Sequence, residues 1–268
     1  MEIPLLVRFS RLKGIYMIKV VLFDFHNTLA TCDSWLELEI KTLPGLALAR
    51  LRSEGYLDGQ PEHSPEEATK LFRELRADVR KSGVELSAFE GTKRVLAQMD
   101  YHVPDEALLA VVAELEYDCL LDLEIMPGAH ECLRSLSERG YRLGVVSSAG
   151  FPPFVESALE TLGLRTYFNE VLTSAGEGIY KSDPEIFRRA VERLDAVPSE
   201  AVHIGDHAIY DVQAAHAAGL SAIWFSAQAE RTARLHNANW DDLQKAGSEA
   251  EAVVTSLEEV PGAVEALR

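Results

Sequence analysis

The stretch VVLFDFHNTLA, residues 20–30, begins as an apolar strand pattern and ends in polar side chains. Its first four residues are apolar, Asp24 follows them at once, and His26 and Thr28 lie two and four places further on. A short apolar run bounded by polar residues is typical of a buried β-strand. In an open parallel α/β sheet, ligands bind at the carboxyl ends of the strands. The stretch therefore predicts a strand whose end carries functional side chains.

Four further apolar runs also stop at polar or small residues, and they predict the other main strands: 143–146, 170–172, 202–204 and 221–225. Helical patterns separate these runs, and two of the helices open at Pro127 and Pro184. Strands that alternate with helices indicate βαβ units and a mostly parallel sheet with right-handed crossovers. We also expect AVVTSL, residues 252–257, to add a strand at the edge of this sheet.

One long interval interrupts this alternation. Residues 34–122 contain helical patterns and no clear strand. An interval of this length is far too long for a simple crossover between two strands. We therefore expect 34–122 to form a small helical domain, inserted between hinges at 31–33 and 122–126. Residues 17–33 and 123–268 would then form the core domain, with residues 1–16 as a flexible N-terminal extension.

The composition favours a packed globular protein and argues against two classes of partner. Hydrophobic residues form 47% of the 268-residue chain. The formal net charge of −17 repels nucleic acid phosphates and anionic membranes, so we expect neither as a partner. No apolar run approaches the roughly 18 residues that a membrane-spanning helix needs. Cys32, Cys119 and Cys132 form no CxxC pair, so we expect reduced thiols in a cytoplasmic protein.

Polar residues follow four of the predicted strands, and the sheet would bring them to one edge. They are Asp24, His26 and Thr28 after the first strand, Ser147 and Ser148 after the second, Lys181 in the loop after the third, and Asp206 and Asp211 after the fourth. The sequence therefore predicts a site with carboxylates, hydroxyls and one amine.

This ordered set resembles the haloacid dehalogenase (HAD) superfamily. DFHNTL is similar to the family's DxDxT motif, GVVSS to the motif that ends in Ser or Thr, KSDPEIF to its Lys motif and GDHAIYDVQAAHAAG to its GDxxxxD motif. The resemblance covers residues 18–226, and the helical insert matches the superfamily's type-1 cap. It implies a Rossmann-like parallel sheet with an inserted α-helical cap domain.

The resemblance implies phosphoryl transfer, and it gives each strand-end residue a role. Asp24 would be the nucleophile that forms an aspartyl-phosphate, although a carboxylate here also suits a turn cap. Ser147, with Ser148, would bind the phosphoryl oxygens, although Ser147 is also a good helix N-cap. Thr28 would hold the first loop through its hydroxyl and help bind substrate. Lys181 would neutralise the charge on Asp24 and on the phosphoryl group.

Magnesium is the implied cofactor, because hard oxygen ligands and phosphate substrates suit it. The resemblance makes Asp24, Asp206 and the backbone carbonyl of His26 the ligands, with Asp211 holding the metal's water shell or Lys181. Asp206 and Asp211 also fit a simpler role as caps at a helix N-terminus. Imidazole is not a favoured magnesium ligand, so we expect packing or surface roles for the three histidines near this motif: His203, His207 and His216.

His26 departs from the family pattern, because phosphatases of the family carry a second aspartate there as the acid and base. An imidazole has an ordinary pKa near about 6.5, so it can give and accept a proton near neutral pH. We expect Asp24 and Asp206 to favour its charged form and a bound magnesium ion to oppose it. A role in filling space within the loop stays open.

The expected function is a magnesium-dependent phosphatase acting on a small phosphorylated metabolite, as a monomer or homodimer. A 2-haloacid dehalogenase, a phosphonatase-like hydrolase and a weakly catalytic protein that binds a phosphorylated ligand are the alternatives. Dehalogenases of the family carry a tyrosine at the position of His26 and generally lack the metal aspartate, so Asp206 favours phosphoryl chemistry. Trp35, Leu36 and Tyr56 are expected either to line the floor of the insert or to pack in its core.

Overall fold

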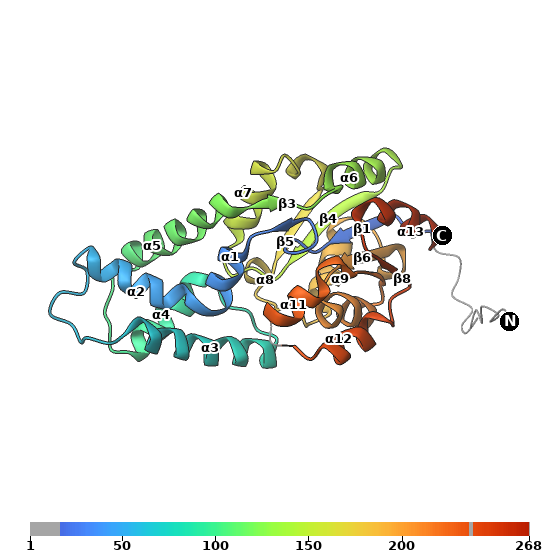
Figure 1. Ribbon diagram of the computed structural model, residues 1–268. Coiled ribbons are helices and arrows are strands. Elements are labelled where there is room, and N and C mark those ends of the chain that lie inside the picture. The colour runs from blue at the N-terminus through green and yellow to red at the C-terminus, as the bar shows by residue number, and fades with distance from the viewer. Residues whose placement is uncertain (1–16, 236–237, 268) are drawn as a thin grey trace.

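A six-stranded parallel sheet forms the centre of the computed structural model, which describes residues 17–235 and 238–267 (Figure 1). Its order is β5–β4–β1–β6–β7–β8. The strands are β1 (Val20–Phe23), β4 (Arg142–Ser147), β5 (Glu170–Thr173), β6 (Ala201–Gly205), β7 (Ser221–Phe225) and β8 (Ala252–Val254). All five predicted strands are confirmed, and so is the edge strand near the C-terminus. The predicted extension, residues 1–16, lies outside the described residues.

The central strand β1 is buried on both faces, and its alternating side chains divide the core into two layers. Val21 and Phe23 belong to the larger apolar cluster on one face, while Val20 and Leu22 belong to the cluster on the other. β1 pairs with β4 on one side and with β6 on the other. Asp24 therefore leaves the sheet at its middle, between the ends of two neighbouring strands.

Helices cover both faces of the sheet, as an alternating sequence pattern predicts. One face carries α6 (Ala129–Glu138), α7 (Pro152–Thr161) and α13 (Val260–Ala266). The other carries α9 (Glu185–Arg193), α10 (Ala214–Ala218), α11 (Ala229–Leu235) and α12 (Trp240–Gly247), and the short α8 (Ser174–Glu177) follows β5. Pro184 is the N-cap of α9, whereas α6 begins two residues after Pro127 because Gly128 takes a left-handed conformation (φ 81°). The α/β, Rossmann-like fold class is confirmed.

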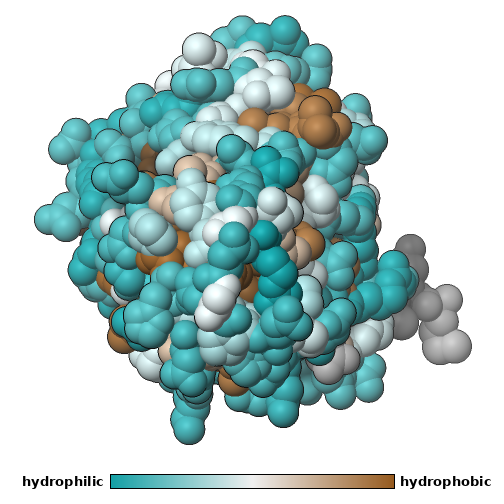
Figure 2. All heavy atoms as spheres, turned by 90° about the vertical axis from the view of Figure 1, so that its left-hand side faces the viewer, coloured by the Kyte–Doolittle hydropathy of each residue, from teal (hydrophilic) through white to brown (hydrophobic). Residues whose placement is uncertain are grey.

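Residues 33–122 fold as helices, as expected, and these helices extend away from the sheet in Figure 1. The segment contains α1 (Asp33–Glu37), a π-helical segment (Leu38–Thr42), α2 (Leu43–Ser53), α3 (Pro65–Ser82), α4 (Ala88–Gln98), α5 (Asp105–Asp118) and a 3-10 turn (Cys119–Asp122). Figure 2 looks onto this end of the molecule and shows a mostly hydrophilic face with small, separate apolar patches. None of the described helices has the length and apolarity that a membrane span requires.

A small antiparallel ribbon joins the insert to the core. β2 (Ala30–Thr31) pairs with β3 (Glu124–Ile125), and both lie where the sequence predicts hinges. The pattern did not reveal these strands, because two residues are too few to show a period. Asp122 accepts a hydrogen bond of 2.5 Å from the Ser34 hydroxyl, so the two connections are also tied by side chains. The domain boundaries at 33/34 and 122/123 stay a prediction.

Leu22 provides a test of the core, because its side chain is fully buried and packs closely against Gly144 of β4. Leu22→Ala should lower the free energy of unfolding by about 2–5 kcal/mol, since it removes apolar contacts and leaves a cavity. Urea unfolding followed by circular dichroism measures this change.

Leu121→Ala is the matched control, because that leucine is 91% exposed. It should change stability by no more than about 0.5 kcal/mol. Equal losses in the two variants would show that the two-layer core is wrongly placed.

Candidate active site

The strand-end residues meet around one small cavity of about 60 Å³. Seven of the eight residues predicted for the site line it: Asp24, His26, Ser147, Ser148, Lys181, Asp206 and Asp211. They come from the ends of β1, β4 and β6, from the π-helical segment after β6 and from the loop before α9. The eighth, Thr28, is fully buried outside this lining.

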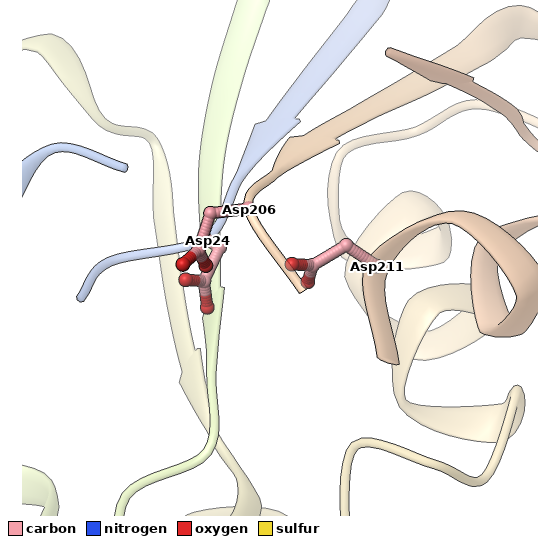
Figure 3. Close-up of side chains that lie close together, drawn as sticks. All are labelled: Asp24, Asp206 and Asp211. Atoms are coloured by element: carbon pink, nitrogen blue, oxygen red, sulfur yellow. The ribbon is translucent and has the colours of Figure 1, made fainter. Parts of the chain in front are cut away.

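Three carboxylates from two loops face one another in this cavity. One oxygen from each of Asp24, Asp206 and Asp211 lies within 4.8 Å of the other two. Figure 3 shows the carboxylates of Asp24 and Asp206 side by side, with Asp211 turned toward them from the following helical segment. Such an arrangement of hard oxygen donors suits a divalent cation.

Lys181 lies between two of these acids. Its Nζ is 2.5 Å from Oδ1 of Asp24 and 2.6 Å from Oδ1 of Asp211. Burial alone lowers the pKa of Lys181, but Asp211 and Asp24 outweigh it and raise the pKa above its ordinary value. The lysine therefore stays charged and links the loop before α9 to the ends of β1 and β6.

One lysine does not balance three buried acids. Burial raises the pKa of Asp24 to about 6, against the opposing effect of Lys181. The pKa of Asp206 is raised well above its ordinary value by burial and by the charges of Asp24 and Asp211. A divalent cation would offset this surplus of negative charge, so the residues present fit the implied metal.

Asp211 is fully engaged by neighbouring groups. Besides Lys181, its Oδ1 lies 3.0 Å from Nε2 of His203, and its Oδ2 accepts a 2.8 Å hydrogen bond from the backbone N–H of His207. Burial raises the pKa of Asp211, but Lys181 and His203 lower it by a larger amount, so the net shift is downward. Asp211 thus holds the backbone at His207, just before the π-helical segment Ala208–Gln213, and also anchors Lys181.

Asp206 has partners that the sequence motifs did not indicate. The Thr232 hydroxyl of α11 donates a hydrogen bond to Asp206 Oδ2, and Asn27 Nδ2 donates to Thr232 Oγ1 at 3.0 Å. The indole of Trp224 donates to the backbone carbonyl of Asp206 at 2.9 Å. Thr232 lies 26 residues from Asp206 in a helix without a recognisable motif, so no local signal marks it.

Ser147 is the last residue of β4 and is only 2% exposed. The next helix, α7, has Phe151 as its N-cap, so the alternative role of Ser147 as an N-cap is wrong. The backbone N–H groups of Gly150 and Phe151 instead donate to the carboxylate of Glu39, at 2.8–2.9 Å and 3.1 Å. A side chain of the insert therefore holds the loop that follows Ser147 and Ser148.

Glu39 is part of a buried polar link between insert and core. Glu39 lies in the π-helical segment Leu38–Thr42 of the insert. Burial raises its pKa to about 7, against the opposing effects of Arg76 and the Gly150 N–H. Arg76 pairs with Glu85 at 2.5 Å, and Glu85 accepts a 2.8 Å hydrogen bond from the Ser174 hydroxyl of the core. Sequence reasoning missed this link, because a helical glutamate normally faces solvent.

The surroundings of His26 differ from the expected ones. Burial lowers its pKa to about 4, and the carboxylates that oppose this shift are Asp33 and Asp122 rather than Asp24 and Asp206. The ring hydrogen bonds to the backbone of Cys32, while Nε2 has no hydrogen-bond partner among the described residues. Near neutral pH the imidazole is therefore uncharged and offers Nε2 as a proton acceptor.

The sequence suggested that Thr28 holds its loop through the hydroxyl, but the described part of the chain shows no such contact. Among residues 17–235 and 238–267, no group pairs with its Oγ1. Backbone hydrogen bonds fix the loop instead, from Asn27 to Ala30 at 2.7 Å and from Leu29 to Phe25 at 2.9 Å. Asn27 takes a positive φ of 60°, a conformation that asparagine adopts more readily than most residues. The substrate-binding role of Thr28 stays a prediction.

Two of the three residues proposed for the floor of the insert reach the cavity. Trp35 and Leu36 line it, whereas Tyr56 is 44% exposed and does not. The Trp35 ring stacks on Phe154 of α7 with 4.6 Å between centroids, and it lies 5.9 Å from the ring of His26. Trp35 therefore serves in both ways, as a wall of the cavity and as packing between insert and core.

The family model described as haloacid dehalogenase-like hydrolase matches residues 18–219. Haloacid dehalogenase-like hydrolase domain-containing protein 3 of Mus musculus is 37% identical over 44% of this chain and 47% of its own, so the match spans about half of that relative. A glyceraldehyde 3-phosphate phosphatase of Methanopyrus kandleri is 30% identical over 77% of this chain and 83% of its own. The crystal structure of a 2-haloacid dehalogenase from Pseudomonas syringae superposes with a TM-score of 0.65 at 24% identity. The superposition covers 94% of this chain and 100% of the dehalogenase.

Glu39 should make stability depend on pH. Its pKa rises from an ordinary 4.5 to about 7 on folding, so ionising it costs more in the folded state than in the unfolded state. Its contribution is therefore fully present below pH 4.5 and is lost as the pH rises through 7. Glu39→Gln should flatten the fall of the unfolding free energy across this window, measured by urea unfolding at a series of pH values.

Glu37→Gln is the control, because its side chain is 61% exposed and lies two residues away in the insert. That variant should follow the wild-type pH profile. Parallel profiles for wild type and Glu39→Gln would contradict the assignment of a buried carboxyl with a raised pKa to Glu39.

Proposed function

Because the chain belongs to the haloacid dehalogenase-like hydrolases, we propose that it is a phosphatase in which Asp24 attacks a small phosphate monoester. Magnesium would be its cofactor. The observation that carries the proposal is the pair of contacts of Lys181 with Asp24 and Asp211, beside the carboxylate of Asp206. This arrangement places a buried carboxylate next to a fixed cation, as attack on a negatively charged phosphoryl group requires.

The reaction would proceed in two displacements. In the first, a carboxylate oxygen of Asp24 forms a bond to phosphorus while the bond to the substrate's alcohol oxygen breaks, and that oxygen takes up a proton from water. In the second, water attacks the same phosphorus and the bond between phosphorus and Asp24 breaks, while the water's proton would pass to the uncharged Nε2 of His26. Asp24 and inorganic phosphate are then free. Lys181 would hold the charge that gathers on the phosphoryl oxygens, and Ser147 and Ser148 would bind them from the end of β4.

Asp24 and Asp206 would hold the magnesium ion together with the backbone carbonyl of His26. Asp211 would act indirectly, since its oxygens already bind Lys181, His203 and a backbone N–H. Thr232 would orient the carboxylate of Asp206. When bound, the ion supplies positive charge that draws the phosphoryl group toward Asp24 and stabilises its transfer.

The relatives support a small phosphorylated substrate. The Methanopyrus kandleri relative is named for its action on glyceraldehyde 3-phosphate, and it aligns with most of this chain. The dehalogenase from Pseudomonas syringae shares the fold, but at 24% identity that likeness concerns the fold alone. The acidic cluster around Asp206 favours phosphoryl chemistry, because a divalent cation bound there would coordinate the hard oxygens of a phosphoryl group.

Asp24→Asn should abolish phosphate release, because an amide cannot act as the nucleophile. The measurement is phosphate release from a broad panel of phosphorylated metabolites with magnesium, repeated after chelation by EDTA. Chelation should suppress wild-type turnover, and added magnesium should restore it.

Asp58→Asn, an exposed change in the insert, is the control and should keep wild-type turnover. Phosphate release that persists in Asp24→Asn would exclude the proposed nucleophile. Halide release from 2-haloacids without added metal, and no phosphate release from any panel member, would favour the dehalogenase instead.

His26→Ala tests whether this residue moves a proton. Its ring lines the cavity and its Nε2 has no partner among the described residues, so we expect a loss in kcat of about 10²–10⁴-fold. His26→Asp restores the residue type of the family's phosphatases and should lose less. Equal kcat in wild type and His26→Ala would assign His26 to packing against Trp35.

A further inference from the structure

The cavity at Asp24 is too small for a complete substrate. Its volume of about 60 Å³ is far below the roughly 300–1,000 Å³ of a pocket that encloses a whole small-molecule ligand. The alcohol part of a phosphate monoester must therefore lie in adjoining space. What lines that space decides which alcohols the protein accepts.

A second, larger hollow adjoins the first between the insert and the core. It has a volume of about 580 Å³, and His207 and Tyr210 line both cavities. The rings of these two residues stack with 4.2 Å between their centroids, so they form a common wall. In Figure 1 the C-terminal end of α3 approaches α11, and residues of both helices line the hollow.

The charge of this hollow is opposite to that of the whole chain. Lys41, Arg73 and Arg80 of the insert line it, and none of its described lining residues carries a carboxylate. The chain as a whole has 26 lysines and arginines against 43 acidic residues. The lining of this hollow, with three cationic side chains and no described acidic one, therefore differs from the average composition of the chain.

The two arginines face the hollow together because they stand seven residues apart on α3, which is close to two helical turns. Arg76, between them, turns inward and pairs with Glu85. Among residues 17–235 and 238–267, no salt bridge engages Arg73 or Arg80, while Lys41 has a long contact of 3.8 Å with Glu37. The guanidinium groups of Arg73 and Arg80 are thus available to a ligand.

We propose that the hollow binds a second anionic group on the substrate, so that the preferred substrates are phosphate monoesters whose alcohol carries a carboxylate or a second phosphate. The phosphoryl group would occupy the cavity at Asp24, and the chain that connects the two anions would cross the stacked rings of His207 and Tyr210. Arginine suits the far anion because its planar fork donates two parallel hydrogen bonds to a carboxylate or phosphate.

This inference rests on the proposed phosphatase activity, and it separates the protein from the relative's named substrate. Glyceraldehyde 3-phosphate ends in an uncharged aldehyde, so it would leave Arg73 and Arg80 without an anionic partner. A two-ended anion would engage both cavities. The inference therefore predicts a preference that family membership alone does not supply.

The kinetic test uses matched substrate pairs that differ only in the far charge. They are ω-phosphooxy-alkanoic acids of increasing chain length, each compared with its uncharged methyl ester, and sugar bisphosphates compared with the corresponding monophosphates. Wild type should prefer the two-ended anion in kcat/KM. Arg73→Gln and Arg80→Gln should each lower this preference by about tenfold to a hundredfold, the effect of losing a charged hydrogen-bond partner.

Arg94→Gln is the control, because Arg94 is an exposed cation of the insert that does not line the hollow. It removes the same charge and should leave the preference unchanged. Equal kcat/KM for charged and uncharged members in wild type, or equal effects of Arg73→Gln and Arg94→Gln, would overturn the inference. The carboxylate and bisphosphate series together show which far anion is preferred.

A binding measurement keeps the inference separate from the reaction. Titration calorimetry on Asp24→Asn with an ω-phosphonoalkanoic acid, and with its methyl ester, requires no turnover. The acid should bind more tightly than its ester, and this difference in affinity should disappear in Arg73→Gln and persist in Arg94→Gln. That result would support anion binding in the hollow even if no phosphatase activity were found. Equal affinity for acid and ester would contradict it even if the phosphatase activity were established.

Discussion

The contacts of one buried ammonium group with two carboxylates hold together the edge of the sheet at which the parallel strands end. Lys181 reaches Asp24 at the end of β1 and Asp211 after β6, and thereby joins three loops that are far apart in the sequence. Loss of Lys181 would leave the buried carboxylates without their cation, which costs several kcal/mol. The pairing still leaves a surplus of negative charge around Asp206, and this surplus makes the site suited to a cation.

The helical insert takes part in the site's construction as well as covering it. Glu39 binds the backbone of the loop after Ser147, and Trp35 forms one wall of the cavity. Arg76 and Glu85 connect α3 to the core through Ser174. The position of the insert and the shape of the loop after Ser147 are therefore coupled, because the same buried polar groups contact both.

The distribution of charge gives the two cavities different tasks. Around Asp24, buried acids and one lysine suit a metal ion and a phosphoryl group. Beyond His207 and Tyr210, Arg73 and Arg80 of α3 form no salt bridge within residues 17–235 and 238–267, and they suit an anion in a chain whose net charge is negative. Charge at short range governs which ligands enter a narrow site. The charged groups that line each cavity therefore matter more for selectivity than the net charge of the molecule.

The sequence by itself determined the parallel sheet, the helical insert and the meeting of Asp24, Lys181, Asp206 and Asp211. Strand periodicity is a local signal, and parallel strands bring their carboxyl ends to one edge, so these positions follow without coordinates. Only the tertiary structure decided which groups surround them. Thr232 beside Asp206, Glu39 on the Gly150 loop, the burial of His26 and the arginine-lined hollow all join residues that no common motif connects. Such contacts depend on how the insert and α11 pack against the sheet, and packing between distant elements leaves no periodic mark in the sequence.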